Sequence, residues 1–112
     1  MDTTYTHKRY PETPTELLKS LNGFEELAIK RAFEGMGIGD MVERDKSRFG
    51  RGLLFAAIRR DKLAMGIPQG EADAQAYQEA MLATMEQVTE AFEDEPDEPV
   101  PSEPRSEVGK DS

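Results

Sequence analysis

The stretch Arg51-Gly-Leu-Leu-Phe-Ala-Ala-Ile-Arg-Arg60 contains the longest uninterrupted apolar run of the chain. The run has arginines on both sides, and no strong stop signal follows it until Gly66 and Pro68. A segment of this length, with glycine and then proline beyond its end, is typical of a buried helix. We therefore expect a helix over roughly residues 47–65.

Two shorter helices are expected before this stretch, each with a capping box at its start. Thr13 precedes Glu16 by three residues, and Asn22 precedes Glu25 by three residues. In such a box the cap side chain accepts a hydrogen bond from the third helical N–H, while the third side chain accepts one from the cap. Apolar residues spaced by three and four then continue over residues 24–33, which predicts the second helix.

Glycine placement suggests where the chain is not helical. Glycines alternate with other residues over 35–39, and such a series destabilises a helix. We expect a flexible loop from there to about Asp45. The glycines at positions 50 and 52 are expected to weaken the first turns of the helix over 47–65.

A fourth helix is expected over residues 71–92, where large apolar side chains recur every three or four positions. The opposite face carries glutamine and glutamate, as a solvated face should. No segment alternates apolar and polar residues for long enough to predict a strand. The sequence therefore predicts an all-α fold, a small bundle of about four helices. The apolar face of the fourth helix comprises Ala74, Tyr77, Met81, Met85, Val88 and Phe92.

The charge of the chain is concentrated near its C-terminus. The 112 residues carry 23 acidic and 14 basic side chains, a net charge of −9. Residues 93–112 hold eight of the acidic and two of the basic residues, a net charge of −6, together with four prolines. This composition predicts a disordered acidic tail. Residues 1–12 have no periodicity and are predicted to form a flexible arm, which leaves residues 13–92 as one helical domain.

Composition and motifs argue against several functional classes. An acidic chain is repelled by nucleic-acid phosphates and by anionic membranes, so we expect neither as a partner. The absence of cysteine excludes disulfides, thiolate zinc sites and a cysteine nucleophile. The single histidine, His7, lies in the predicted arm, and the acidic run over residues 93–98 lacks the turn that closes a calcium site. We therefore expect no enzyme activity, no cofactor and no metal site.

A basic segment runs against the overall charge. Between Met41 and Lys62 the chain has seven basic and three acidic residues, a local charge of +4. Two interpretations remain open. The charges are either a solubilising surface that also complements the negative C-terminal end of a helix dipole, or a docking face for an acidic partner or for the protein's own acidic tail. In the second case Arg51, Arg59 and Arg60 are candidate binding residues.

The string Asn22-Gly-Phe-Glu-Glu-Leu-Ala-Ile29 and the following residues 30–33 resemble the opening of tail assembly chaperones from long-tailed bacteriophages, especially those that infect actinobacteria. The later order of segments is also similar to that family. An apolar-then-arginine helix like residues 51–60 is followed by a helix that ends like residues 85–92, and then by an acidic, proline-containing tail like residues 93–104.

The resemblance implies a chaperone that binds the long helical tape-measure protein in the host cytoplasm and is absent from the mature virion. Tail tube protein and a second copy of the chain are further candidate partners. Such proteins often have a longer form made by a −1 ribosomal frameshift, and Val108-Gly109-Lys110 is compatible with a slippery heptamer. Apolar helix faces would make the contact, so the candidate partner-binding residues are Phe24, Leu27 and Leu54, together with the three arginines named above.

A second hypothesis from the sequence belongs to a different class. The chain would be a small acidic regulator or inhibitor that binds a basic protein through residues 93–112. This hypothesis predicts that the tail suffices for binding and that binding weakens steeply with salt. The chaperone hypothesis predicts that removing the tail spares binding, whereas a charge at Phe24, Leu27 or Leu54 abolishes it.

Overall fold

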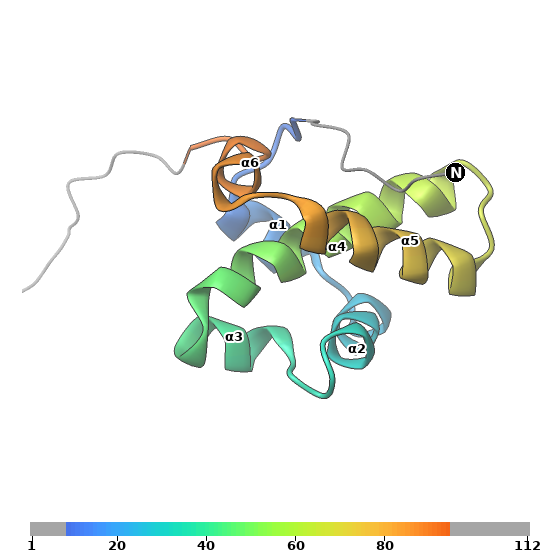
Figure 1. The fold of residues 1–112 in the computed structure, drawn as a ribbon, viewed down its shortest axis with the longest axis horizontal. Coiled ribbons are helices and arrows are strands. Elements are labelled where there is room, and N and C mark those ends of the chain that lie inside the picture. Colours follow the sequence, from blue (N-terminus) through green and yellow to red (C-terminus); the bar gives the residue numbers. More distant parts are fainter. Residues whose placement is uncertain (1–8, 95–112) are drawn as a thin grey trace, which may run out of the picture.

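The computed structural model describes residues 9–94, and this part of the chain contains six helices and no strand. The predicted all-α fold is confirmed, with two more helices than expected (Figure 1). The helices in chain order are α1 (Pro14–Ser20), α2 (Gly23–Ala32), α3 (Ile38–Arg44), α4 (Lys46–Ala64), α5 (Gln69–Leu82) and α6 (Met85–Glu90).

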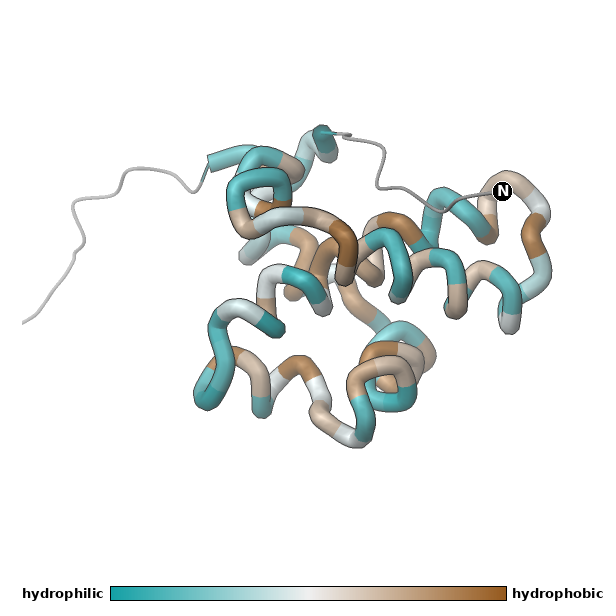
Figure 2. The backbone as a smooth tube through the Cα atoms, in the orientation of Figure 1, coloured by the Kyte–Doolittle hydropathy of each residue, from teal (hydrophilic) through white to brown (hydrophobic). Residues whose placement is uncertain are grey.

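Helix α4 is the centre of the bundle. Its residues 52–59 are all buried, and α4 packs against every other helix of the described part. Figure 1 shows α2 and α3 on one side of α4 and α6 on the opposite side, with α5 running alongside. Figure 2 shows hydrophilic and hydrophobic positions mixed within the outer helices, as expected of helices that bury one face. The helix predicted from the apolar run is therefore confirmed within one residue at each end.

The first two helices begin as the sequence predicts. Thr13 Oγ1 accepts a hydrogen bond from the Glu16 N–H at 3.1 Å, and Glu16 Oε1 accepts one from the Thr13 N–H at 3.0 Å. Asn22 and Glu25 exchange the equivalent two bonds, each 2.9 Å long. Both capping boxes satisfy backbone N–H groups that have no partner inside the helix.

The expected loop from residue 35 to about Asp45 is wrong over most of its length. Only residues 33–37 form the connection, and α3 follows. Ile38 and Met41, three positions apart, are both buried against α4. Burial of these two side chains outweighs the modest helix propensity of the glycine between them.

The glycines near the start of α4 allow close packing. A β-carbon at Gly52 would lie 2.9 Å from Met41 Sδ and 3.2 Å from Ile38 Cδ1 of α3. A β-carbon at Gly50 would lie 2.9 Å from Val88 Cγ1 of α6. Each glycine therefore lets a neighbouring helix approach α4 more closely than any other residue would allow, and this contact compensates for its low helix propensity.

The predicted fourth helix is two helices, α5 and α6, with a break at Ala83 and Thr84. Thr84 caps α6 through a third capping box with Gln87. Arg51 Nη2 donates a hydrogen bond to the Ala83 carbonyl at 2.8 Å, which satisfies an acceptor that the break leaves outside the helix. A local cap and a long-range arginine together stabilise the break.

The buried face of α5 also differs from the prediction. Ala72, Ala76 and Ala80 are fully buried, whereas Met81 and Met85, expected on the apolar face, are exposed. Alanines four positions apart let α5 lie close to α4, and large side chains there would hold the two helices apart. The remaining members of the predicted face divide, since Ala74 is exposed, Tyr77 is partly buried, and Val88 and Phe92 are buried.

The predicted arm extends too far along the chain, because residues 9–12 pack against the end of α6. Tyr10 is buried, its ring stacks on Phe92 with centroids 5.8 Å apart, and its N–H donates to the Ala91 carbonyl at 2.7 Å. The Glu93 N–H donates to the Glu12 carbonyl at 2.9 Å. The other parts of the predicted arm and tail, residues 1–8 and 95–112, lie outside the described residues.

Candidate functional site

The basic residues at the C-terminal end of α4 form ion pairs within the chain. Arg59 pairs with Asp73 of α5, and its side chain is almost completely buried. Lys62 Nζ lies 2.7 Å from a carboxylate oxygen of Glu79, also on α5. These residues therefore fasten α5 to α4. Arg59 was a candidate docking residue, and burial makes that role wrong.

Arg60 connects α4 to the start of α2. Its Nη2 donates to Glu25 Oε1 at 2.9 Å and to the Ser20 carbonyl at 3.2 Å, and its Nε donates to the other Glu25 oxygen. The hydrogen bonds from Arg60 lower the pKa of Glu25, against the opposing effect of burial, and the Asn22 N–H lowers this pKa further. The same hydrogen bonds raise the pKa of Arg60. Arg60 is thus also engaged inside the molecule.

Arg51 is engaged in a third way. Besides its bond to the Ala83 carbonyl, its Nη1 lies 3.1 Å from Met85 Sδ. The side chain bridges α4 and the break between α5 and α6. The three arginines predicted as a docking face therefore have intramolecular partners, and within the described residues the structure favours a stabilising role for them.

Leu54 was predicted to contact a partner, and its position excludes this. Its side chain is 0% exposed in the middle of α4. A charge at this position would be buried without a counter-charge and would unfold the domain before it could affect a surface contact. The sequence could not separate a core leucine from a contact leucine, because both occupy apolar positions of a helix.

Phe24 and Leu27, by contrast, are exposed. Phe24 is 81% exposed and Leu27 is 49% exposed, and they lie three positions apart, about one turn, on α2. Leu27 also lines a groove of about 300 Å³ between α2 and α3. Gly23, Gly37 and Gly39 contribute glycine backbone to its walls, and Glu26 and Lys30 add charges of both signs. We call this groove, together with Phe24, the α2–α3 surface.

Other exposed apolar side chains were not expected from the sequence. Met81, Leu82 and Met85 surround the break between α5 and α6, and Met65 follows the end of α4. The signals that could have revealed the first group were the alanine repeat at four-residue spacing in α5 and the Thr-x-x-Gln box at residues 84–87. The repeat identifies the buried face by small residues, and the box marks a new helix start.

No set of three or more metal-binding side chains comes together among residues 9–94. No helix of this part is long and apolar enough to cross a membrane. His7, the single histidine, lies outside the described residues. Of the predicted acidic run, Glu93 and Asp94 are described, and Glu93 pairs with Arg9 at 3.5 Å.

Comparison with known proteins adds no family assignment. No protein-family model, no curated protein and no solved structure matches the chain.

Proposed function

We propose that this protein is a tail assembly chaperone of a long-tailed bacteriophage, which binds the tape-measure protein through the α2–α3 surface. The observation that carries the proposal is Phe24. An aromatic side chain that is 81% exposed on a small bundle stands in the very string, residues 22–29, that resembles the chaperone family. Exposed aromatic residues of this size are characteristic anchors of protein–protein contacts.

The shape of the surface suits a helical ligand. Phe24 and Leu27 lie about one turn apart, so they present an apolar ridge parallel to α2. Beside this ridge, the glycines lining the groove permit a close backbone approach. An amphipathic helix binds in such a groove through apolar residues at three- and four-residue spacing. A tape-measure protein is a long, mostly helical chain that presents many stripes of this kind before the tail tube encloses it.

The chaperone must cover these stripes and later leave. Exposed apolar stripes on a long unassembled chain cause aggregation, so covering them keeps the chain in solution. Many copies bound with modest affinity would achieve high occupancy and could still be displaced by tube subunits. The net charge of −9 makes bound neighbours repel one another and favours solubility.

The test is co-purification with the product of the long helical reading frame in the genome that encodes this chain. Phe24→Asp should weaken binding by about 10- to 100-fold, because burying a phenylalanine contributes about 1.5–3 kcal/mol. Met65→Asp is the matched control, since Met65 is 72% exposed, follows the end of α4 and does not line the groove between α2 and α3. Circular dichroism should show both variants folded.

The acidic-regulator hypothesis makes the opposite prediction for the same assay. If deletion of residues 95–112 abolishes binding while Phe24→Asp retains it, the chaperone proposal is wrong. The coding sequence offers an independent check. We expect a slippery heptamer at the codons for Val108 to Lys110 and an overlapping −1 reading frame followed by a very long helical gene. Absence of both would count against the proposal.

A further inference from the structure

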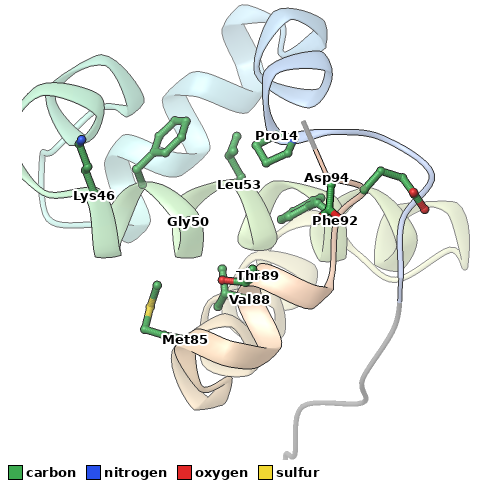
Figure 3. Close-up of a pocket in the computed structure, with 11 residues that line it drawn as sticks. Pro14, Lys46, Gly50, Leu53, Met85, Val88, Thr89, Phe92 and Asp94 are labelled. Carbon is green, nitrogen blue, oxygen red and sulfur yellow. The ribbon is translucent and has the colours of Figure 1, made fainter. Parts of the chain in front are cut away.

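Four glycines of residues 9–94 are small for a reason that lies within the fold. Gly35 and Gly66 have φ angles of 90° and 86°, which residues with a β-carbon rarely adopt. Gly50 lies on α4 next to Val88 of α6 (Figure 3), and a β-carbon on this glycine would lie 2.9 Å from the valine. A β-carbon at Gly52 would be equally close to a side chain of α3. Turn geometry or internal packing therefore accounts for these four glycines.

The other glycines of residues 9–94 have no such reason. None of them has a positive φ angle, and an added β-carbon would meet no atom of the chain closer than 4.0 Å. One is Gly70, the second residue of α5. The other three, Gly23, Gly37 and Gly39, all line the groove of the α2–α3 surface. Positions 23 and 39 are helical, where alanine would be more favourable than glycine.

The groove stays open because these three positions carry no side chains. Its volume is about 300 Å³, whereas one water molecule takes about 30 Å³ of liquid water. Leu27 lines the groove and is 49% exposed, so water contacts an apolar side chain there. A large apolar side chain from a partner would displace this water and cover Leu27, which is favourable.

The groove also carries one charge of each sign. Glu26 and Lys30 are exposed, line the groove and lie four positions apart, about one turn of α2. Neither of them forms an ion pair within residues 9–94. A partner that has a basic and an acidic side chain near its apolar residue can pair with both, and such complementarity favours it over partners without these charges.

We propose that the groove of the α2–α3 surface receives one large apolar side chain of a helical ligand, and that Gly39 determines this specificity by leaving the space for it. The ligand is an amphipathic helix in which a residue of the size of leucine is flanked by one basic and one acidic residue. Helices with only small residues at this position are poor ligands. This inference rests on the proposed function, because it names the class of helix that the α2–α3 surface binds.

The first test uses two synthetic amphipathic helical peptides that differ only at the central apolar position, which is leucine in one and alanine in the other. Lysine and glutamate flank this position in both. Methyl NMR of the full chain detects binding through Leu27 and Ile38, which line the groove. The alanine peptide should bind about 10- to 100-fold more weakly than the leucine peptide. If neither peptide shifts these resonances, or if both bind equally well, the proposal is wrong.

Substitution of Gly39 tests its role. Gly39→Leu should weaken binding of the leucine peptide by about 10-fold or more, because the new side chain takes the place of the ligand side chain. It should not lower the thermal midpoint, since leucine favours a helix more than glycine does. Gly70→Leu is the matched control, because Gly70 is the second residue of its helix, as Gly39 is, and does not line the groove. Equal affinities of the two variants would overturn the role of Gly39.

The charges are tested with a third peptide, in which glutamine replaces the flanking lysine and glutamate. The natural chain should bind the charged leucine peptide about 2- to 5-fold more tightly, since exposed ion pairs contribute little each. The double variant Glu26→Gln with Lys30→Gln should bind both peptides equally. A natural chain that does not distinguish the two peptides would contradict the pairing.

The tape-measure protein distinguishes failure of this inference from failure of the proposed function. If the peptides behave as expected but the tape-measure protein does not co-purify with the chain, the proposed function is wrong and the specificity of the groove is retained. If Phe24→Asp loses the tape-measure protein while Gly39→Leu binds it as tightly as the natural chain does, the proposed function is retained and the role of Gly39 is wrong.

Discussion

At the C-terminal end of α4, Arg59, Arg60 and Lys62 each pair with a carboxylate of another helix. At the N-terminal end of the same helix, and within residues 9–94, Lys46 makes no ion pair and Arg48 pairs only with Asp45, three positions away, at 3.5 Å. Asp45 caps α4, and hydrogen bonds from the Ser47 hydroxyl and then the Arg48 N–H lower its pKa.

The difference between the two ends shows that residue type alone does not determine the role of a charge. The C-terminal pairs are partly or fully shielded from water and connect α4 to α2 and α5. Charged contacts are strong where water is excluded and weak where it is present. The charged residues at the C-terminal end of α4 therefore hold α2 and α5 against α4. The charged residues at its N-terminal end are available for other interactions.

The largest expected effect is the loss of Arg59. Arg59→Ala should lower the free energy of unfolding by about 2–4 kcal/mol, because it leaves Asp73 without its partner in a largely buried site. Urea unfolding followed by circular dichroism measures this as a lower midpoint with an unchanged slope. The double variant Arg59→Met with Asp73→Leu should recover most of the loss. A single variant as stable as the natural chain would contradict the role of this end.

A smaller, pH-dependent effect is expected at Glu25. Glu25→Gln keeps the capping geometry but removes the charge that Arg60 binds, which should lower the free energy of unfolding at pH 7 by about 1–2 kcal/mol. Because the folded-state pKa of Glu25 lies below its ordinary value of 4.5, the advantage of the natural residue is present above that pH. It should disappear as the pH falls through the lower folded-state pKa.

Urea unfolding over a pH series from 7 to about 2.5 would measure this dependence. Glu16→Gln is the control, since Glu16 occupies the same position in the capping box of α1 and forms no ion pair within residues 9–94. Its effect should be small at every pH. A constant difference between Glu25→Gln and the natural chain down to the acid end would show that the ion pair is not its cause.

Close packing at the start of α4 should make alanine unfavourable at Gly50. A β-carbon there would lie 2.9 Å from the stiff Val88 side chain, so overpacking should outweigh the gain in helix propensity and destabilise the protein by about 1 kcal/mol. Gly70→Ala in α5 meets no atom within 4 Å and should instead stabilise the protein by up to about 1 kcal/mol. Thermal unfolding distinguishes the two signs. Equal shifts would mean that α6 does not pack against Gly50.

The smallest effect is expected for Arg48 at the N-terminal end. Arg48→Ala removes an exposed contact between neighbours on one helix, and such contacts contribute little to stability. Its urea midpoint should match that of the natural chain within error. A loss comparable to that of Arg59→Ala would remove the contrast between the two ends.

Local signals predicted much of the fold. The capping boxes at Thr13 and Asn22, and the glycine after α4, mark helix ends through hydrogen bonds within a few residues, so they can be recognised in one dimension. The long apolar run predicted the central helix, because it is also a continuous segment of the sequence. The missed capping box at Thr84 shows that a local signal can be obscured when the apolar period appears to continue through it.

The candidate site was less predictable than the fold. Phe24, Leu27 and Leu54 are all apolar residues on helices, yet two are exposed and one is completely buried. Arg60 is expected to lie at the surface because its side chain is charged. Its partner Glu25 is 35 positions away in the chain, so the pair cannot be recognised from the sequence around either residue. Exposure and long-range pairing depend on how the helices are arranged relative to one another. The apolar period of a single helix gives no information about that arrangement.

The sequence by itself determined that this protein is helical, where its first helices begin, and which segment would be central, because these properties follow from local backbone bonding and from the need to bury apolar side chains. Only the tertiary structure decided which face of α5 is buried, which of the basic residues are paired, and which apolar side chains remain exposed. These properties depend on the distance between helices, and small residues far apart in the chain, Gly50, Gly52 and the alanines of α5, determine that distance.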